Sequence, residues 1–374
     1  MQNASRLWRS SAAPRREEGS ESRPAGGQVS RLRSPARRRA LIGLAAGVVV
    51  ILAVTYPWIA TNPYYRFVGT MTVMSMALAM SWNIMGGFTG YVSLGHSAFF
   101  GLGAYFTGIT VTRLDMPPFG MAVAAGLFVA VLAIPIGYLA LRTRNASFVI
   151  VTIALVYITG LLAQAWRGLT RGTAGLSLPR LEGFGRDDIH IPFYFAFLIL
   201  LAIVFLVTWW ISRSRFGMGL IAIREDEDKA EMLGVNTDIY KLTAFVASAT
   251  FVGIAGGVYA YWYSYLDPTF VFDVGIGLNM ILMSLLGGIR SIVGPMLGAL
   301  IIVPSSEYFL AQYGGSQFHL MATGLLLAIV VLVMPQGIIP AVESIIKRFR
   351  APAPSIRESA SESSPPPQPT KAPS

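Results

Sequence analysis

Charged residues are scarce in this chain of 374 residues, and cysteine is absent. Asp, Glu, Lys and Arg together make up 13% of the sequence and hydrophobic residues make up 54%, whereas charged residues form about 25% of a typical soluble domain. So few charges cannot cover the surface of a soluble globular protein, which excludes that class. The absence of cysteine excludes disulfides, thiol catalysis, Cys-ligated zinc and iron–sulfur clusters.

Histidine and the common catalytic motifs are also nearly missing. The three histidines, His96, His190 and His319, are far apart in the sequence, so a histidine metal centre is not expected. The chain contains no G-x-x-x-x-G-K-[ST] phosphate loop, no H-E-x-x-H and no G-x-S-x-G. Because these motifs carry ATP hydrolysis and hydrolase chemistry, we predict that the chain does not hydrolyse ATP, and we assign no catalytic residue, metal or cofactor. A membrane enzyme of another kind stays an alternative without positive evidence.

Long uncharged stretches dominate what remains. A membrane-spanning helix needs about 20 apolar residues, and the uncharged stretch at 67–112 is long enough for two helices, which we expect to be broken at Gly86–Gly90. The fold class predicted is therefore an all-α integral membrane protein with about ten transmembrane helices. The predicted spans are 40–59, 67–85, 94–112, 119–141, 147–165, 192–211, 242–263, 274–289, 292–310 and 317–336.

The Lys and Arg residues set the expected orientation. The net charge is +10, and in a membrane protein basic residues indicate the cytoplasmic side before they indicate nucleic acid, which we do not expect as a partner. Both tails are basic, so we expect both termini to be cytoplasmic. Residues 1–39 and 341–374 are too polar to form a core and are predicted to be disordered. The arginine run at 31–39 fits a topology anchor better than a binding site for anionic membrane lipid.

A charged segment at 213–241 interrupts the spans on the expected cytoplasmic side. Gly217 and Gly219 should break the incoming helix, and Gly234 is a plausible helix end. We predict two short helices that lie across the membrane face and expose apolar residues among charges. Docking to a soluble partner fits this pattern; a surface-lying amphipathic helix without a partner is the alternative. The residues singled out here are Arg215, Gly217, Arg224, Glu225, Ala230, Leu233 and Gly234.

Two glycine-rich segments, 86–104 and 287–299, each join an inward-running helix to an outward-running one. Interrupted segments in the two halves of a transporter indicate a substrate path, although tight helix packing explains the same glycines. The candidate path residues are Ser93, Gly95, His96, Phe99, Gly287, Gly288, Gly294 and Pro295. His96 fits a hydrogen-bonding packing group better than a proton relay. Asp267, Asp273 and Glu307 either attract a cation or amine at the outer side or are ordinary helix-end charges.

These motifs resemble a known family. Gly90-Tyr91-Val92-Ser93-Leu94-Gly95-His96, followed by Phe99, Gly101 and Gly103-Ala104-Tyr105, is similar to the G-x-x-S-L-G-H-x-x-F-x-G-x-G-A-Y signature of branched-chain amino-acid ABC permeases of the LivH/LivM type. The segments Arg213–Gly217, Ala222–Glu225, Gly287-Gly288, Gly294-Pro295 and Pro335-Gln336-Gly337 also match, in order. The resemblance covers about residues 65–340 and is closer to LivM. Arg290 departs from it, because glycine is common there.

The resemblance implies a permease subunit of an ATP-driven importer with type II architecture in the bacterial inner membrane. Residues 40–340 would form the permease domain, and 213–241 its ATPase-coupling loop. The implied partners are two cytoplasmic ATPases of the LivG/LivF type, a LivH-type permease and an extracytoplasmic substrate-binding protein. The implied solutes are leucine, isoleucine and valine, translocated by alternating access, or urea and short amides. A self-sufficient secondary carrier or channel, and a membrane enzyme built on Ser93 and His96, are the alternatives from other classes.

Overall fold

The computed structural model describes residues 35–181, 185, 188–314, 324 and 337–339. The predicted tenth span, almost all of it, lies outside these residues, as do the C-terminal tail and most of the N-terminal tail. The chain divides into two units, Met1–Ala53 and Val54–Ser374. Helix α1 (Pro35–Ile59) coincides with the predicted first span and crosses the division. The description below concerns the second unit.

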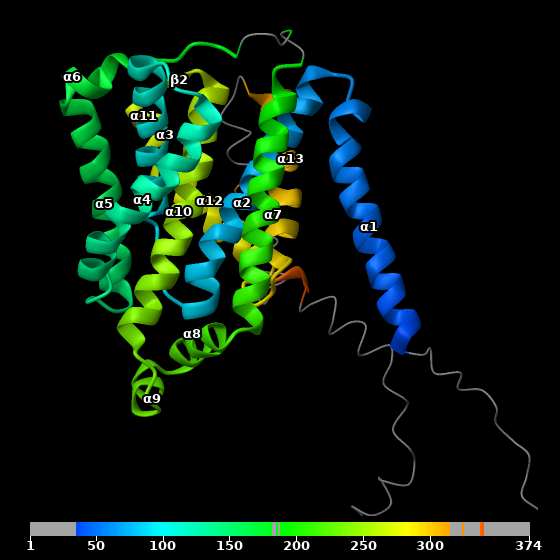
Figure 1. Ribbon diagram of the computed structural model, residues 1–374, viewed down its shortest axis with the longest axis vertical. Helices are drawn as coiled ribbons and strands as arrows, with labels where there is room; N and C mark the ends of the chain where they lie inside the picture. The colour runs from blue at the N-terminus through cyan, green and yellow to red at the C-terminus, as the bar shows by residue number, and fades with distance from the viewer. Residues whose placement is uncertain (1–34, 182–184, 186–187, 315–323, 325–336, 340–374) are drawn as a thin grey trace, which may run out of the picture. The chain divides into compact units, whose positions relative to one another are not determined.

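Helices make up nearly all of the second unit in the part that the structure describes (Figure 1). The long helices are α2 (Pro63–Thr89), α3 (His96–Leu114), α4 (Pro118–Ala140), α5 (Ala146–Ala165), α7 (His190–Arg213), α10 (Thr237–Tyr263), α12 (Val274–Gly287) and α13 (Gly294–Tyr313). The short helices are α6 (Arg167–Thr170), η1 (Gly172–Ala174), α8 (Arg215–Glu225), α9 (Glu227–Met232) and α11 (Pro268–Val271). Each predicted span from 67–85 to 292–310 falls on one long helix.

Seven helical stretches of the described chain are long and apolar enough to cross a membrane. They are α2, α4, α5, α7, α10, α13 and the stretch Pro268–Gly287, which contains α11 and α12. Helix α3 is not among them because His96, Arg113, one serine, three threonines and three glycines lower its mean hydropathy. The integral membrane class is therefore supported, while the count of about ten spans and the orientation stay predictions.

The first predicted helix break lies later than expected. Helix α2 continues through Gly86 and Gly87 and ends at Gly90, whose φ of 79° places it in the left-handed region that glycine tolerates best. The two earlier glycines lie inside the helix, where the ring of Trp82 and the amide of Asn83 occupy the space that their side chains would need. The second break is where the sequence places it: α12 ends at Gly287 and α13 begins at Gly294.

Helices α3 and α10 meet backbone to backbone. A Cβ atom added to Gly103 would collide with the carbonyl of Gly253, and one added to Gly256 would collide with the carbonyl of Phe100. Small residues permit this approach, which gives membrane helices their tightest packing. Helix α10 also packs against α4, α2 and α7, so it lies at the centre of the described bundle.

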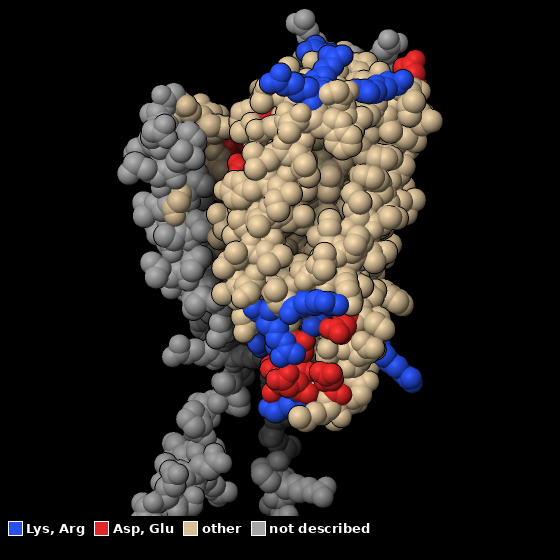
Figure 2. All heavy atoms as spheres, turned by 90° about the vertical axis from the view of Figure 1, so that its left-hand side faces the viewer, with Lys and Arg blue, Asp and Glu red and all other residues tan. Residues whose placement is uncertain are grey.

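The connections between helices gather at two ends of the bundle (Figure 1). One end, called here the α9 end, holds α8, α9 and the connections at 90–95, 141–145 and 288–293. The opposite end, called here the α6 end, holds α6, α11 and the strand pair in which β1 (Leu176–Ser177) runs antiparallel to β2 (Tyr265–Leu266). Charged side chains concentrate at these two ends, and uncharged residues form the broad band between them (Figure 2).

Candidate functional site

The connection at 90–95 follows Gly90 and leads into α3 through buried polar groups. The indole N–H of Trp82 donates to the Ser93 carbonyl at 2.8 Å, and the Gly95 amide donates to the Ser93 hydroxyl at 3.3 Å. A Cβ on Gly95 would lie 3.0 Å from Thr152 on α5. The connection is therefore fixed by α2 on one side and α5 on the other.

His96 is fully buried at the start of α3 and belongs to a hydrogen-bond chain. The Ser248 hydroxyl donates to the Ser81 carbonyl at 2.7 Å, so its oxygen accepts from His96 Nε2, which lies 2.7 Å away. This arrangement assigns the proton of a neutral imidazole to Nε2. The rings of Phe99 and Phe245 surround the imidazole. His96 thus ties α3 to α10 and α2, as expected of a packing group, and no carboxylate among the described residues contacts it.

The second glycine-rich segment forms an equally tight corner. Gly288 follows α12 with a φ of 111°, which again favours glycine. A Cβ on Gly287 would collide with the Gly294 carbonyl, and one on Gly298 would collide with the Met283 carbonyl. Pro295 stands in the first turn of α13, where a proline costs no hydrogen bond.

The structure brings the two glycine-rich segments together. A Cβ on Gly87 would lie 2.8 Å from the Ile289 carbonyl, and one on Gly277 would lie 2.6 Å from the Leu94 carbonyl. The Ser284 hydroxyl of α12 also donates to the Ala79 carbonyl of α2 at 3.1 Å. The eight candidate path residues are all buried, so in this conformation they form a packed seam. Their role in a solute path stays a proposal.

The segment 213–241 folds as two short helices, as predicted, but the helix break differs from the prediction. Helix α7 ends at Arg213, and the Ser214 side chain caps α8 by accepting from the Gly217 amide at 3.1 Å. Gly217 and Gly219 lie inside α8, so the expectation that they break the helix is wrong. Gly217 is needed instead because a side chain there would collide with the Ile211 carbonyl. The cap at Ser214 was the available signal.

Helix α9 begins and ends with well-formed caps and exposes an apolar tip. The Asp226 carboxylate accepts from the Lys229 amide at 3.1 Å, and hydrogen bonds from Lys229 lower the pKa of Asp226. Gly234, with a φ of 85°, ends the helix as the sequence predicts. Met232 and Leu233 have exposed fractions of 85% and 83%, which makes them an apolar knob among charged residues.

Arg224 and Glu225 connect α8 to both glycine-rich segments. The Arg224 guanidinium donates to the Gly87 carbonyl at 2.9 Å, and its stem lies where a side chain on Gly90 would be. Glu225 lies 3.8 Å from Arg290 in the second segment. Of the other residues singled out in this loop, Ala230 and Gly217 are buried, while Arg215, Leu233 and Gly234 are exposed.

Sequence reasoning missed an ionic cluster beneath α9. The Glu227 carboxylate lies 2.5 Å from Lys241 Nζ, 2.5 Å from the Tyr91 hydroxyl and 3.5 Å from Arg144. Burial by itself raises the pKa of Glu227, but the hydrogen bonds from Lys241 and Tyr91, together with the positive charge of Lys241, outweigh burial and leave that pKa lowered. Burial and the hydrogen bond to Glu227 raise the pKa of Tyr91. The charge run at 224–229 was the only sequence signal.

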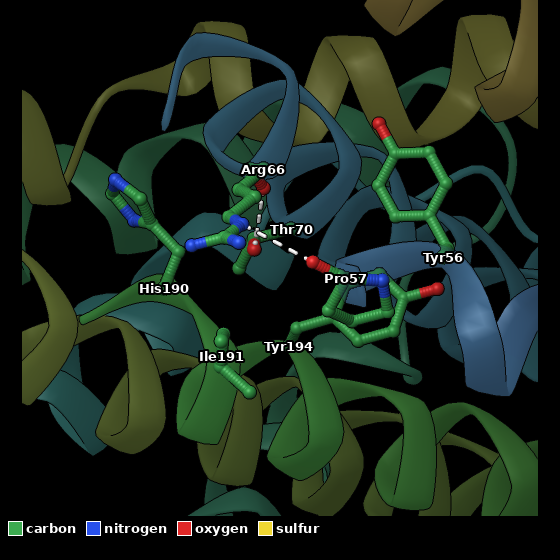
Figure 3. A pocket seen from close by; sticks show the side chains of 7 residues that line it. All are labelled: Tyr56, Pro57, Arg66, Thr70, His190, Ile191 and Tyr194. Carbon is green, nitrogen blue, oxygen red and sulfur yellow. Dashed lines mark hydrogen bonds between the residues drawn. The ribbon is translucent and has the colours of Figure 1, made fainter. Parts of the chain in front are cut away.

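A small recess at the α6 end contains Arg66 (Figure 3). Its guanidinium donates to the carbonyls of Ala60 at 2.7 Å and Pro57 at 3.1 Å, both at the end of α1. It also forms an ion pair with Asp188 at 2.5 Å. The rings of Tyr56 and Tyr194 stack beside it, with centroids 5.7 Å apart. Arg66 therefore satisfies a helix C-terminus and fixes residues 56–60 against α7.

Three exposed arginines stand on the α6 end, in the connection between α5 and α7. Arg167, Arg171 and Arg180 are exposed, and within the described residues none of them has a carboxylate at ion-pair distance. The pairing of β1 with β2 and a hydrogen bond from the Thr170 hydroxyl to the Ala163 carbonyl at 2.5 Å hold this connection in place. Trp166 beside them is also largely exposed.

Asp267, Asp273 and Glu307 differ in their structural roles. Asp267 and Asp273 cap α11 and α12, accepting from the Thr269 and Gly275 amides at 2.8 Å each, so they are helix-end charges. Glu307 is half-buried within α13. Among the long helices of the described chain it is the one carboxylate beyond the first turn.

Comparison with known proteins agrees with the motifs. A family model described as branched-chain amino acid transport system, permease component, matches residues 64–334. The high-affinity branched-chain amino acid transport system permease protein LivM of Escherichia coli (strain K12) is 26% identical over 317 residues, covering 78% of this chain and 73% of that protein. The corresponding LivH protein of Escherichia coli (strain K12) is 28% identical over 290 residues, covering 72% and 92%. No solved structure matches the chain.

Proposed function

The chain belongs to the family of permease components of branched-chain amino acid transport systems, since the family model covers residues 64–334, and we propose that it is the LivM-type permease subunit of an ATP-driven importer. It is a multi-pass protein of the inner membrane. The proposed solutes are leucine, isoleucine and valine, in keeping with the systems to which its relatives belong. ATP binding and hydrolysis on partner chains would bias two conformations of the permease.

The exposed knob on α9 carries this proposal. A connection between two spans needs only a few residues, yet this one builds two capped helices and presents Met232 and Leu233 to solvent. An exposed apolar tip with a charged surround is suited to a groove on a soluble partner. We assign the α9 end to the cytoplasm and propose that one of the two ATPases of the LivG/LivF type docks on this knob.

The arginines on the α6 end support an extracytoplasmic partner. Arg167, Arg171 and Arg180 are exposed and unpaired within the described chain, beside Trp166. Arginine and tryptophan are enriched at the centre of protein interfaces. The strand pair and the Thr170 hydrogen bond hold residues 170–177 of the connection in place, so this part loses little entropy on binding. An acidic surface of a substrate-binding protein would complement this face. A second permease subunit of the LivH type completes the proposed assembly.

A self-sufficient secondary carrier would need an ion-coupling group within its spans. In the described long helices, Glu307 is the only carboxylate beyond the first helical turn and therefore the only candidate for that group. Such a carrier would also give the α9 knob no role. An enzyme built on Ser93 and His96 is disfavoured because His96 Nε2 is committed to Ser248. Urea or a short amide stays the alternative solute within the same family.

Affinity purification of the tagged chain from its native membrane tests the proposal. We expect two ATPase chains and one homologous permease to co-purify, and reconstituted complex to import labelled leucine only with ATP and the binding protein. Labelled urea in the same vesicles distinguishes the alternative solute. Recovery of the chain alone, with transport driven by an ion gradient, would refute the proposal in favour of a secondary carrier.

A further inference from the structure

Helix α9 has little apolar contact with the rest of the bundle. It is six residues long, and Ala230 is its one buried residue. Its tip, Met232 and Leu233, points into solvent. The attachment of α9 must therefore depend on polar contacts, and most of these are made by one side chain, Glu227.

Glu227 connects its own helix, α9, to three other segments of the chain. Its partners are Lys241 in the first turns of α10, Tyr91 in the connection between α2 and α3, and Arg144 in the connection between α4 and α5. The exposed fractions of the Glu227 and Lys241 side chains are 13% and 2%. Because water is largely excluded, each of these charges depends on the other. Without its partner, Lys241 would keep only Asp238 at 3.5 Å, and Glu227 would keep Tyr91 and, at 3.5 Å, Arg144.

Tyr91 links this carboxylate to the glycine-rich seam. The Tyr91 ring packs edge-on against Phe148 of α5 with centroids 5.3 Å apart, and Lys241 Nζ lies 5.4 Å from the centre of the same ring. A displacement of α9 therefore acts on Tyr91 and Lys241 together. Tyr91 stands between Gly90, where α2 ends, and the buried Ser93 and His96.

We propose that Glu227 is a positioning residue that transmits movement of α9 to the 90–95 connection through Tyr91 and to α10 through Lys241. The inference rests on the proposed function, because it assumes that an ATPase moves α9. It goes beyond that function by assigning the coupling to one buried contact set rather than to the docking knob. Energetic coupling needs such a physical connection between two sites.

The neighbouring residue offers a matched control. Asp228 also stands on α9 and also pairs with Arg144, at 3.0 Å, but 70% of its side chain is exposed. Asp228→Asn removes the same charge from the same helix without touching Tyr91 or Lys241. Tyr91→Phe is the mildest test variant, since it keeps the ring and its packing on Phe148 and removes only the hydroxyl that reaches Glu227.

The experiment compares the full assembly containing wild-type, Glu227→Gln, Tyr91→Phe or Asp228→Asn permease in vesicles. Three quantities are measured: ATPase chains retained, ATP hydrolysis with and without loaded binding protein, and leucine taken up per ATP hydrolysed. We expect both Glu227→Gln and Tyr91→Phe to retain the ATPases and basal hydrolysis, while uptake per ATP falls about 5-fold or more, the lower bound of a typical coupling between sites. Asp228→Asn should keep the wild-type ratio.

Two results would overturn the inference alone. One is wild-type uptake per ATP in Tyr91→Phe; the other is a fall in uptake and hydrolysis in equal proportion, which indicates a merely structural contact. If Glu227→Gln fails to assemble, Tyr91→Phe decides. A wild-type chain that retains no ATPase refutes the proposed function and this inference with it.

Discussion

Substitution of Leu233 by aspartate should separate docking from folding. The Leu233 side chain is 83% exposed, so nearly all of its apolar surface is available to a partner. Burying a leucine side chain contributes about 1.5–3 kcal/mol, which corresponds to roughly a 10- to 100-fold change in the docking equilibrium. Aspartate loses this contribution and adds the cost of burying a charge. We therefore expect Leu233→Asp to weaken ATPase binding by at least about tenfold.

The same exposure predicts that the fold is little affected. Leu233 is the C-cap residue of α9, but its backbone N–H makes the cap contacts, so aspartate adds only the cost of a negative charge at a helix C-terminus, about 0.3–1 kcal/mol. Binding is measured by titrating purified ATPases onto permease in lipid nanodiscs, and stability by thermal unfolding of the same samples. Leu233→Met should behave as wild type in both. Phe270→Asp is the matched control, because Phe270 is 72% exposed on α11 at the opposite end of the bundle.

Two outcomes would contradict this reasoning. Wild-type ATPase affinity and uptake in Leu233→Asp would show that the knob is not the docking surface. A large drop in unfolding temperature would show that Leu233 stabilises the fold, so that lost binding would carry no information about docking.

Three further predictions concern packing, capping and pH. Gly256→Val places a side chain on the Phe100 carbonyl and should lower the free energy of unfolding by about 1–3 kcal/mol through overpacking, which is measured as a lower unfolding temperature. Gly168→Ala, whose side chain meets open space, should leave the unfolding temperature unchanged. Arg66→Met removes the donor to the carbonyls at the end of α1. It should lower the free energy of unfolding by about 1.5–3 kcal/mol, the contribution of a hydrogen bond to a charged group, and an unchanged unfolding temperature would refute the capping role. The pKa of Glu227 in the fold is lower than its ordinary value of 4.5. The ionised carboxylate therefore contributes its full stabilisation above pH 4.5, and this contribution is lost as the pH falls from 4.5 through the lowered pKa. The stability difference between wild type and Glu227→Gln should accordingly shrink on acidification, and a difference independent of pH from 7 to 3.5 would contradict this.

The spans could be read from the sequence because lipid excludes charge. The predicted span 119–141 differs from α4 at 118–140 by one residue at each end. The predicted span 147–165 differs from α5 at 146–165 by one residue at its start. The ends of α2 and α8 were harder to place. Gly86 and Gly217 look like helix breakers in isolation, but both lie inside helices. Glycine is required at each because a neighbouring group, the Trp82 ring or the Ile211 carbonyl, occupies the space of a side chain.

The ionic cluster under α9 was beyond sequence reasoning for a similar reason. Tyr91 and Glu227 are 136 positions apart, and Lys241 resembles any basic residue that flanks a span. Only the fold shows that Lys241 is buried and that the segment 213–241 meets the first glycine-rich segment there. The fold also gives a contact for Arg290, which stands where the family commonly has glycine: its guanidinium lies 3.8 Å from the Glu225 carboxylate.

The glycine contacts between α3 and α10 limit how this protein can move. At Gly103 and Gly256, peptide groups of one helix lie against the bare backbone of the other, so no side chain there can yield to a shift. Sliding of α3 along α10 would press backbone against backbone. We therefore expect the two helices to move as one unit whenever the protein changes shape.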